Sequence, residues 1–156
     1  MAWQVRPYQM TEISPLMERS LQTAGAQLME REARRASAAQ LATQVQRMFA
    51  QTLGAQGGTC LVATNGSAIG GYVLLMPTPN PFTGAQEGVV MDIWVDPGLR
   101  GNGMARLLLS ATEEWGSSVG VTGLAAQVAV HNQASLRAFL KAGYQVERYV
   151  LGKEAH

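Results

Sequence analysis

Two spacings of apolar residues divide this chain into segments. Apolar residues recur every three or four positions after Ser14, Ser37, Gly103 and Asn132, which is typical of one buried helix face. Short apolar runs bounded by glycine, proline or asparagine lie between these segments and are typical of strands. The pattern therefore predicts strands at 3–6, 59–64, 68–76, 87–95, 124–130 and 144–151, and helices at 14–24, 37–54, 103–115 and 132–143.

Residues at the ends of these segments indicate how several of them begin or turn. Ser14, followed by a proline, fits a helix cap, and Ser37 with Gln40 fits a capping box. Asn65-Gly66 is a strong signal for a β-hairpin between the two strands that it separates. Gly70-Gly71, inside the second of these strands, predicts a bulge or a close approach of another backbone.

The order of the elements is strand, helix, helix, three strands, helix, strand, helix, strand. This order predicts an α+β fold with one mixed α/β sheet flanked by helices. Three prolines and a glycine between 77 and 86 predict a loop, and the third helix is expected to stop at Gly116. No linker or repeat divides the sequence, so residues 1–156 are expected to form a single domain.

Composition excludes several classes of protein. Apolar residues make up 47% and charged residues 15% of the 156 residues, which excludes a disordered chain. The net charge of +1 provides no basic field for nucleic acid, and no apolar run reaches the about 20 residues of a membrane span. The lone Cys60 cannot form an internal disulfide, and the N-terminus lacks a signal pattern. We therefore expect a soluble, cytoplasmic protein with no nucleic-acid and no membrane partner.

Residues 91–105 join the end of a strand, a glycine-containing turn and the start of a helix. A helix start offers free N–H groups and the positive end of its dipole to an anion, and Arg100 adds a fixed charge. Met104-Ala105 stands where a P-loop needs Lys-Ser or Lys-Thr, which excludes that motif. Arg106 stands where a dinucleotide fingerprint needs its third glycine, so that motif is weakly supported. The stretch predicts a phosphate-bearing ligand, with a plain surface turn as the alternative.

Two motifs in this half of the chain resemble those of one family. R-x-x-G-x-A, from Arg100 to Ala105, follows V-x-P and resembles the acetyl-CoA pyrophosphate motif of the GNAT superfamily of N-acetyltransferases. NQASLRAFLKAGY, from Asn132 to Tyr144, resembles the family's N-x-x-[AS]-x-x-x-[YF]-x-x-x-G-[FY] segment. The resemblance covers about residues 59–150. It implies the GNAT acyl-CoA N-acyltransferase fold, a splayed central mixed sheet flanked by helices.

The resemblance also implies an activity and a set of binding residues. It implies that the acetyl group of acetyl-CoA, the co-substrate, passes without a metal to a primary amine of a small molecule or peptide. The amine attacks directly in a ternary complex, and main-chain N–H groups around Trp94 and Val95 stabilise the oxyanion. The residues expected to bind acetyl-CoA are Ile93, Trp94, Val95, Arg100, Gly101, Asn102, Gly103, Met104, Ala105, Asn132, Ser135 and Phe139.

The amine must lose a proton before it attacks, and two carboxylates on the preceding strand are candidates for the base. Alternation along a strand places Asp92 on the face opposite Met91, Ile93 and Val95, which are expected to face the core. If Asp92 points into the cleft it can act as the base; an ordinary solvent-facing carboxylate is the alternative. Glu87, at the start of the strand, is the weaker candidate, and His131 is a third.

The acid that would protonate the leaving thiolate is the main departure from the family pattern. Relatives often carry a tyrosine seven positions after Asn132, where this chain has Phe139. Tyr144 is a further candidate for a catalytic hydroxyl, with core packing as its alternative role. A thiol with a pKa of about 8.5 can also leave unassisted or through water. The second function that remains open is a catalytically inactive CoA-binding module that serves as a sensor or interaction partner.

The C-terminal segment predicts an assembly. The chain ends one strand short of many relatives, after the strand-forming segment 144–151. Native proteins cover or charge such an edge strand, and Glu147 and Arg148 do so only in part. We therefore expect a homodimer in which the C-terminal strands, or the helices beside them, meet across a two-fold axis. A monomer with a short, twisted edge is the alternative.

Overall fold

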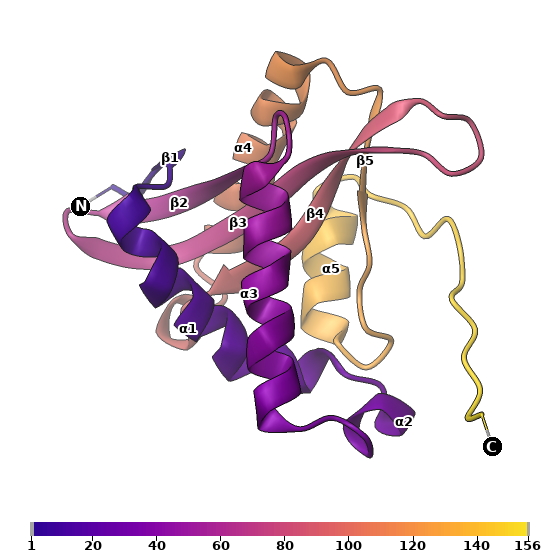
Figure 1. Ribbon diagram of the computed structural model, residues 1–156. Coiled ribbons are helices and arrows are strands. Elements are labelled where there is room, and N and C mark those ends of the chain that lie inside the picture. The colour runs from indigo at the N-terminus through magenta and orange to yellow at the C-terminus, as the bar shows by residue number, and fades with distance from the viewer. Residues whose placement is uncertain (1, 156) are drawn as a thin grey trace.

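A five-stranded mixed sheet forms the middle layer of the protein, whose computed structural model describes residues 2–155 (Figure 1). Each strand lies beside the next one in the chain. The first three pairs of neighbouring strands are antiparallel, and the pair formed by the fourth and fifth strands is parallel. The strands are β1 (Gln4–Pro7), β2 (Thr59–Asn65), β3 (Ala68–Pro79), β4 (Gln86–Val95) and β5 (Gly123–Ala126).

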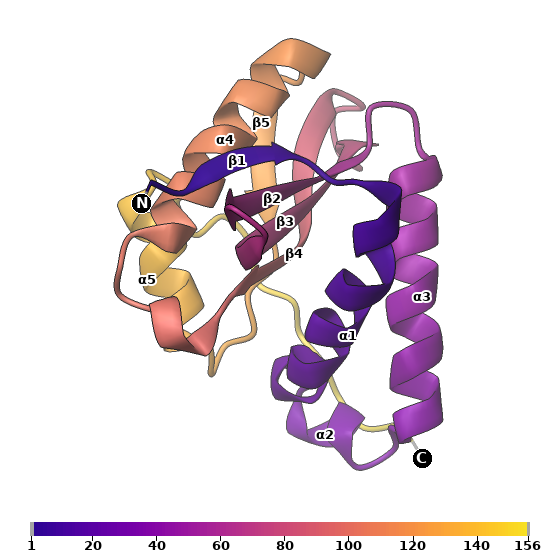
Figure 2. The same cartoon turned by 90° about the vertical axis from the view of Figure 1, so that its left-hand side faces the viewer.

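Two pairs of helices cover the two faces of the sheet (Figure 2). One face carries α1 (Ile13–Ala24) and α3 (Ala38–Gly54), and the other carries α4 (Met104–Val119) and α5 (Gln133–Lys141). This arrangement confirms the predicted α+β fold with a mixed sheet. The short elements are η1 (Met10–Glu12), η2 (Gly25–Gln27), α2 (Glu30–Ala33) and η3 (Pro97–Leu99).

Alternate side chains of the strands fill two separate apolar cores. Between the sheet and α4 and α5, the core includes Val73, Leu75, Val90 and Leu108. Between the sheet and α1 and α3, it includes Leu16, Phe49, Tyr72, Leu74 and Trp94. Because each strand of a three-layer fold contributes to both cores, the side chains of β4 point alternately to the two faces wherever its pairing is regular.

Several sequence-predicted boundaries agree with the structure. Ser37 Oγ accepts a hydrogen bond from Gln40 N over 3.1 Å, and Gln40 Oε1 accepts one from Ser37 N over 2.8 Å, so the capping box is confirmed. Gly70 is the extra residue of a bulge against β2. A Cβ on Gly71 would lie 2.7 Å from the Trp94 carbonyl oxygen, which is the predicted close backbone approach.

Other predicted boundaries were wrong. α1 begins at Ile13, after η1, so Ser14 does not cap it. β3 continues through Pro79, which pairs with Gln86, and the connecting loop shrinks to 80–85. Gly116 does not end α4: it is buried inside the helix, and a Cβ there would lie 3.1 Å from the Val121 side chain. The helix ends at Gly120, whose φ of 75° is left-handed.

The last predicted strand is absent from the described residues. β5 ends at Ala126, and residues 144–151 pair with no strand within 2–155. After α5 the chain instead runs along the surface past the β3–β4 loop to the region of α2 (Figure 1). Arg148 lies over the Phe82 ring at 4.1 Å, and Arg35 pairs with Glu154 at 3.0 Å. We call residues 145–155 the C-terminal arm.

None of the helices within residues 2–155 combines the length and the apolar character that crossing a bilayer requires.

Candidate functional site

β4 and β5 separate halfway along β4, which creates an open strand edge. The parallel ladder runs from Glu87 to Val90 and ends where Val90 lies opposite Ala126. On its other side, β4 stays paired with β3 as far as Val95. Residues 91–95 therefore have a partner strand on one edge and none among residues 2–155 on the other. This is the splay that the family resemblance implies.

A β-bulge accompanies the splay and redirects the side chains of β4. Leu74 of β3 pairs with Asp92 and the next residue, Leu75, pairs with Val90, so Met91 is the extra residue. A bulge bends its strand and shifts the side-chain alternation by one position. Without it, Asp92 would share the α4 face with Val90. With it, Asp92 faces α1, as its hydrogen bond to Ser20 shows.

The predicted orientation of β4 was therefore right for Ile93 and Val95 but wrong for Met91. Ile93 and Val95 pack on the core beside α4, opposite Asp92. Met91 packs on the core beside α1 and α3, the same side as Asp92. Period-two alternation cannot place both neighbours of a bulge correctly, because the bulge inserts one residue into the period.

The main-chain N–H groups of Ile93 and Val95 point toward the open edge. Asp96 N donates to Gly70 O over 2.9 Å, which makes these two residues a hydrogen-bonded pair. Such pairs alternate along antiparallel strands, so Trp94 is bonded to β3 and its two neighbours are not. Of the predicted oxyanion donors, Val95 is thus available at the open edge. The main chain of Trp94 is turned toward β3, and its indole faces α1.

The predicted phosphate loop leads from the open edge into α4. Asp96 Oδ1 accepts a hydrogen bond from Gly98 N over 2.8 Å, which holds the turn after β4. Gly101 and Gly103 have left-handed φ values of 83° and 80°, and nothing lies within 4 Å of a Cβ built at either. Residues with side chains adopt such angles only at a cost, so these two positions require glycine.

The first turn of α4 presents donors at this loop. Gly103 is the N-cap and has no side chain to accept from the first N–H groups. The N–H groups of Met104, Ala105 and Arg106 have no hydrogen-bond partner among residues 2–155. Arg100, which precedes the first glycine, is exposed. The loop thus joins a free helix start, a fixed cation and an open backbone, which together suit a diphosphate.

Asn132 and Ser135 lie at the start of α5. Asn132 Oδ1 accepts a hydrogen bond from Ser135 N over 3.1 Å, so the predicted helix cap is confirmed. The Asn132 amino group makes no hydrogen bond within residues 2–155, and neither does the Ser135 hydroxyl. Both side chains are half-buried. Both therefore have hydrogen-bonding capacity left for a ligand.

Asp92 is held by two hydroxyl groups from two other elements. Tyr72 OH of β3 donates to Asp92 Oδ2 over 2.6 Å, and Ser20 Oγ of α1 donates to the same oxygen over 2.7 Å. Tyr72 is fully buried, and burial, followed by the charge of Asp92, raises the pKa of its hydroxyl well above the ordinary value. Asp92 itself is half-buried, so its other oxygen can be reached.

The other candidate bases lie in different surroundings. Glu87 belongs to the paired half of β4, roughly 17 Å along the strand from Asp92, and accepts a hydrogen bond from Asn80 Nδ2 over 3.0 Å. The His131 ring is exposed, and its Nε2 lies 2.6 Å from Ala26 O. Because a carbonyl oxygen only accepts, Nε2 carries the proton of this bond. The open half of β4 therefore brings Asp92 alone of these three to the site.

Phe139 and Tyr144 lie in the core beside α4. Phe139 is 4% exposed, and its ring meets that of Tyr144 edge-on with the centroids 5.0 Å apart. The Tyr144 hydroxyl is buried and has no hydrogen-bond partner among the described residues. Burial, then the charge of Glu113, raises its pKa to about 12. A hydroxyl this enclosed and this weakly acidic is a poor proton donor to a thiolate, so the structure places both residues in core packing.

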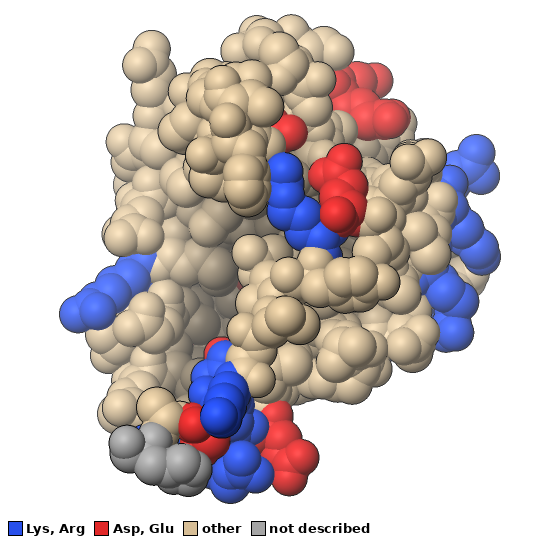
Figure 3. Space-filling view, turned by 90° about the vertical axis from the view of Figure 1, so that its right-hand side faces the viewer, with Lys and Arg blue, Asp and Glu red and all other residues tan. Residues whose placement is uncertain are grey.

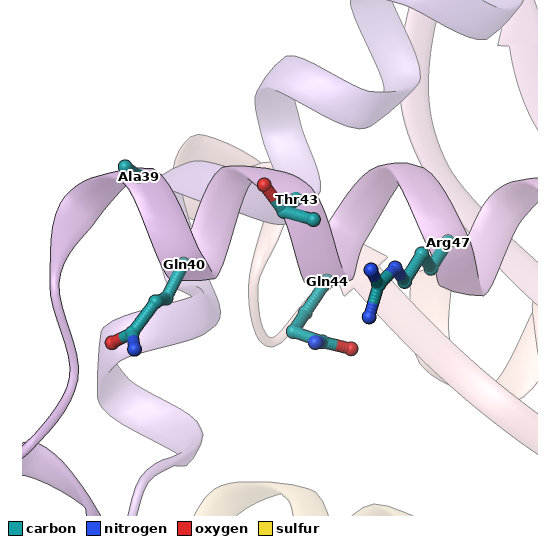
Figure 4. Close-up of a pocket in the computed structure, with 5 residues that line it drawn as sticks. All are labelled: Ala39, Gln40, Thr43, Gln44 and Arg47. Carbon is teal, nitrogen blue, oxygen red and sulfur yellow. The ribbon is translucent and has the colours of Figure 1, made fainter.

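Two surface depressions lie outside the open edge. One lies between α1 and the end of β4, where the Trp94 ring has the Arg19 guanidinium 5.3 Å above it. The other follows the outer side of α3, and all the residues that line it come from that helix (Figure 4). A single helix face brings no groups together from different elements. We therefore assign no function to the second depression.

Comparisons with known proteins agree with this geometry. The acetyltransferase (GNAT) family matches residues 25–144. A comparison with curated proteins finds no match to the sequence.

Solved structures share the fold. A candidate acetyl transferase from Pyrococcus furiosus superposes with a TM-score of 0.83 at 19% identity, over 99% of this chain and 100% of that one. The aminoglycoside 6'-N-acetyltransferase AAC(6')-IG from Acinetobacter haemolyticus gives 0.71 at 19% identity, over 98% of each chain. AAC(6')-Iy in complex with the bisubstrate analogue CoA-S-monomethyl-acetylneamine gives 0.70 at 18% identity, over 100% of each chain.

Proposed function

The chain belongs to the acetyltransferase (GNAT) family, and we propose that it moves an acetyl group from acetyl-CoA to a primary amine of a small molecule or peptide. The amine attacks the thioester directly in a ternary complex. The observation that carries the proposal is that three features of β4 lie next to one another. The end of the β4–β5 ladder, the Met91 bulge and the side chain of Asp92 lie within three consecutive residues.

Acetyl-CoA would supply an activated acetyl thioester at the open edge of β4. The free N–H groups of residues 104–106 and the Arg100 guanidinium would hold its diphosphate, with Gly101, Asn102 and Gly103 forming the backbone beneath it. The amino group of Asn132 and the hydroxyl of Ser135 would bind the pantetheine arm. The N–H groups of Ile93 and Val95, which point toward the open edge, would stabilise the charge that the carbonyl oxygen gains, because preorganised donors stabilise an oxyanion.

Asp92 would accept the proton that the attacking ammonium must lose. Its Oδ2 is occupied by Tyr72 and Ser20, whereas its Oδ1 makes no hydrogen bond within residues 2–155. A carboxylate held in one orientation, with one oxygen free, suits a general base. For the thiolate, the buried Tyr144 hydroxyl is not offered to the site, so its departure would be unassisted or through water.

The acceptor we propose is a small-molecule amine in preference to a peptide. The solved structures with this fold include two aminoglycoside N-acetyltransferases, which supports an amine-bearing small molecule. The face of the molecule that carries the C-terminal arm is hollowed, and both basic and acidic side chains lie around the hollow in Figure 3. A concave surface suits a small-molecule ligand better than an extended partner.

The second candidate function is a CoA-binding module without catalysis. The observation that favours it is the pair Phe139 and Tyr144, because neither presents a hydroxyl to the open edge. The loop at α4 would still bind CoA in such a module, but no acetylated amine would form.

We further propose a homodimer in which the C-terminal arm contacts a second copy. Within the arm, four large apolar side chains are between 60% and 91% exposed: Val146, Tyr149, Val150 and Leu151. Such a cluster in one extended segment is typical of a surface that another chain covers. β5 pairs only with β4 among the described strands, so its outer edge offers main-chain groups to an added strand. The arm of a second copy suits this edge, since the chain's own arm runs to α2 instead.

A transfer screen tests the proposed function. Purified protein and acetyl-CoA are mixed with polyamines, aminoglycosides, amino acids and N-terminal peptides, and the released thiol and the acetylated amine are both measured. We expect thiol release that depends on one class of amine, with a matching mass increase of that amine. Binding of acetyl-CoA without any acetylated product would favour the CoA-binding module instead.

A further inference from the structure

We propose that Ser20 and Tyr72 are positioning residues that hold Asp92 in one rotamer and direct proton transfer to its Oδ1. This inference rests on the proposed role of Asp92 as the base. Neither residue belongs to the two sequence motifs of the cofactor site, since Ser20 lies on α1 and Tyr72 on β3. Their role follows from three side chains that meet at one carboxylate oxygen.

The two hydroxyl groups saturate Asp92 Oδ2. A carboxylate has about four acceptor sites, two on each oxygen. Tyr72 OH and Ser20 Oγ take both sites of Oδ2, at 2.6 and 2.7 Å. These distances lie at the short end for O–H···O bonds and are typical of donors to a charged acceptor. Oδ1 is left as the oxygen that can accept a further proton.

Both donors are themselves fixed. Ser20 is 4% exposed and lies in the middle of α1. The Tyr72 ring is fully buried and stacks on Trp94 with 6.1 Å between centroids, while Phe49 of α3 lies against it at 6.0 Å. A side chain bound by two immobile donors loses little further freedom when it meets a substrate. Preorganisation of this kind lowers the cost of reaching the reactive geometry.

The charged and titratable surroundings of Asp92 are few. On β3 it faces Tyr72, whose raised pKa keeps the hydroxyl protonated and thus a donor. On β2 the buried thiol of Cys60 is close enough for the charge of Asp92 to raise its pKa further, after burial. From α1 come the neutral Ser20 and, over the Trp94 ring, the Arg19 guanidinium. The groups that contact the Asp92 carboxyl group most directly are therefore two neutral hydroxyl donors.

The side-chain carboxyl signal of Asp92 tests the inference without any acceptor amine. The chain holds two aspartates, Asp92 and Asp96, so protein with ¹³C-labelled aspartate gives two side-chain carboxyl signals. Asp92→Asn assigns them. In Tyr72→Phe and in Ser20→Ala, each measured at neutral pH, the Asp92 signal should move away from its wild-type position, because each substitution removes one of the two donors to Oδ2.

Internal and matched controls separate this effect from a general disturbance. The Asp96 signal should stay at its wild-type position, because its Oδ1 accepts from Gly98 N and from neither Ser20 nor Tyr72. Tyr8→Phe removes a tyrosine hydroxyl at the rim of the same core that makes no hydrogen bond within residues 2–155, and it should leave both signals unchanged. Ser20→Thr restores a hydroxyl and should return the Asp92 signal toward its wild-type position.

An Asp92 carboxyl signal that keeps its wild-type position in both variants would overturn the inference. If Tyr72→Phe does not fold, the result for Ser20→Ala decides. This outcome differs from failure of the proposed function, which would show as an Asp92→Asn protein that is as active as the wild type. With an amine that the transfer screen identifies, kcat should fall about tenfold in each positioning variant, while the Kd for acetyl-CoA stays the same.

Discussion

Val90 of β4 lies opposite Ala126 of β5 in the last pair of the parallel ladder, and the bulge residue Met91 follows at once. The strand therefore leaves its neighbour and changes its side-chain alternation at the same point. The first change opens a row of main-chain donors, and the second turns Asp92 toward α1. The proposed base and the proposed oxyanion donors thus owe their positions to one local irregularity.

The left-handed glycine at the start of α4 should matter for acetyl-CoA binding. Gly103→Val forces a β-branched residue toward a φ of 80°, which costs about 1–2 kcal/mol unless the loop shifts. Both the strained backbone and a shifted loop would misalign the first N–H groups of the helix. We expect the Kd for acetyl-CoA, measured by calorimetry, to rise at least about tenfold, which equals about 1.4 kcal/mol.

The other end of the same helix supplies the matched control. Gly120 has a φ of 75° and open space around it, so Gly120→Val should lower the free energy of unfolding by a similar amount. Its affinity for acetyl-CoA should stay at the wild-type value. Equal affinities in the two variants would show that α4 does not hold the diphosphate.

Arg100 should contribute through its charge. Arg100→Glu places a carboxylate beside the dianionic diphosphate of acetyl-CoA, so we expect acetyl-CoA binding about tenfold weaker at low salt and a smaller difference at high salt. Arg47→Glu makes the same change of charge on the exposed face of α3 (Figure 4). If both reversals weaken binding equally, the effect belongs to overall charge and not to the loop.

Tyr144 should prove to be a core residue. Tyr144→Phe removes a hydroxyl that is buried without a partner among the described residues, so the variant should keep the wild-type kcat and be as stable or more stable at pH 7. A loss of kcat with an unchanged Kd for acetyl-CoA would instead restore Tyr144 as the acid.

The same variant has a predictable pH dependence. The folded-state pKa of Tyr144 is raised to about 12, above an unfolded value of about 10. A raised pKa stabilises the fold fully below pH 10, and this contribution is lost as pH rises toward 12. Denaturant unfolding between pH 8 and 11.5 should therefore show a smaller loss of stability in Tyr144→Phe than in the wild type. Parallel curves would contradict the assignment.

Local signals in the sequence predicted most of the fold and the glycine-containing turn that leads from β4 into α4. The capping box at Ser37, the hairpin at Asn65-Gly66 and the Asn132 cap depend on a few neighbouring residues, and all are present. The C-terminal strand did not form, although Val146 and Tyr149 favour strands, because strand formation needs a partner edge that propensity does not supply.

The surroundings of Asp92 could not be predicted from the sequence in the same way. A bulge at Met91 leaves no mark in the apolar run from Val89 to Val95, since all positions except Asp92 are apolar. Ser20 is 72 positions away from Asp92 along the chain, and a serine inside a helix looks like any exposed polar residue. Contacts of this kind arise from the packing of α1 on the sheet. To predict the hydrogen bond between Ser20 and Asp92, one would need to know which face of β4 packs against α1.

The C-terminal arm should determine the oligomeric state. Light scattering at micromolar concentration should give the mass of a dimer, and a monomeric mass would contradict the proposed assembly. Replacing Tyr149, Val150 and Leu151 together by serine removes the most exposed apolar side chains of the arm and should give a folded monomer. Met10→Ser, at another exposed apolar side chain, should leave the dimer intact.

The central claim is that Asp92 acts on the amine and not on acetyl-CoA, and Asp92→Asn tests it most directly. One preparation of this variant is used to measure both the Kd for acetyl-CoA, by calorimetry, and the kcat with an amine identified by the transfer screen. The account predicts a wild-type Kd with kcat reduced about 100-fold or more. A kcat within about twofold of the wild type, at the same Kd, would contradict it.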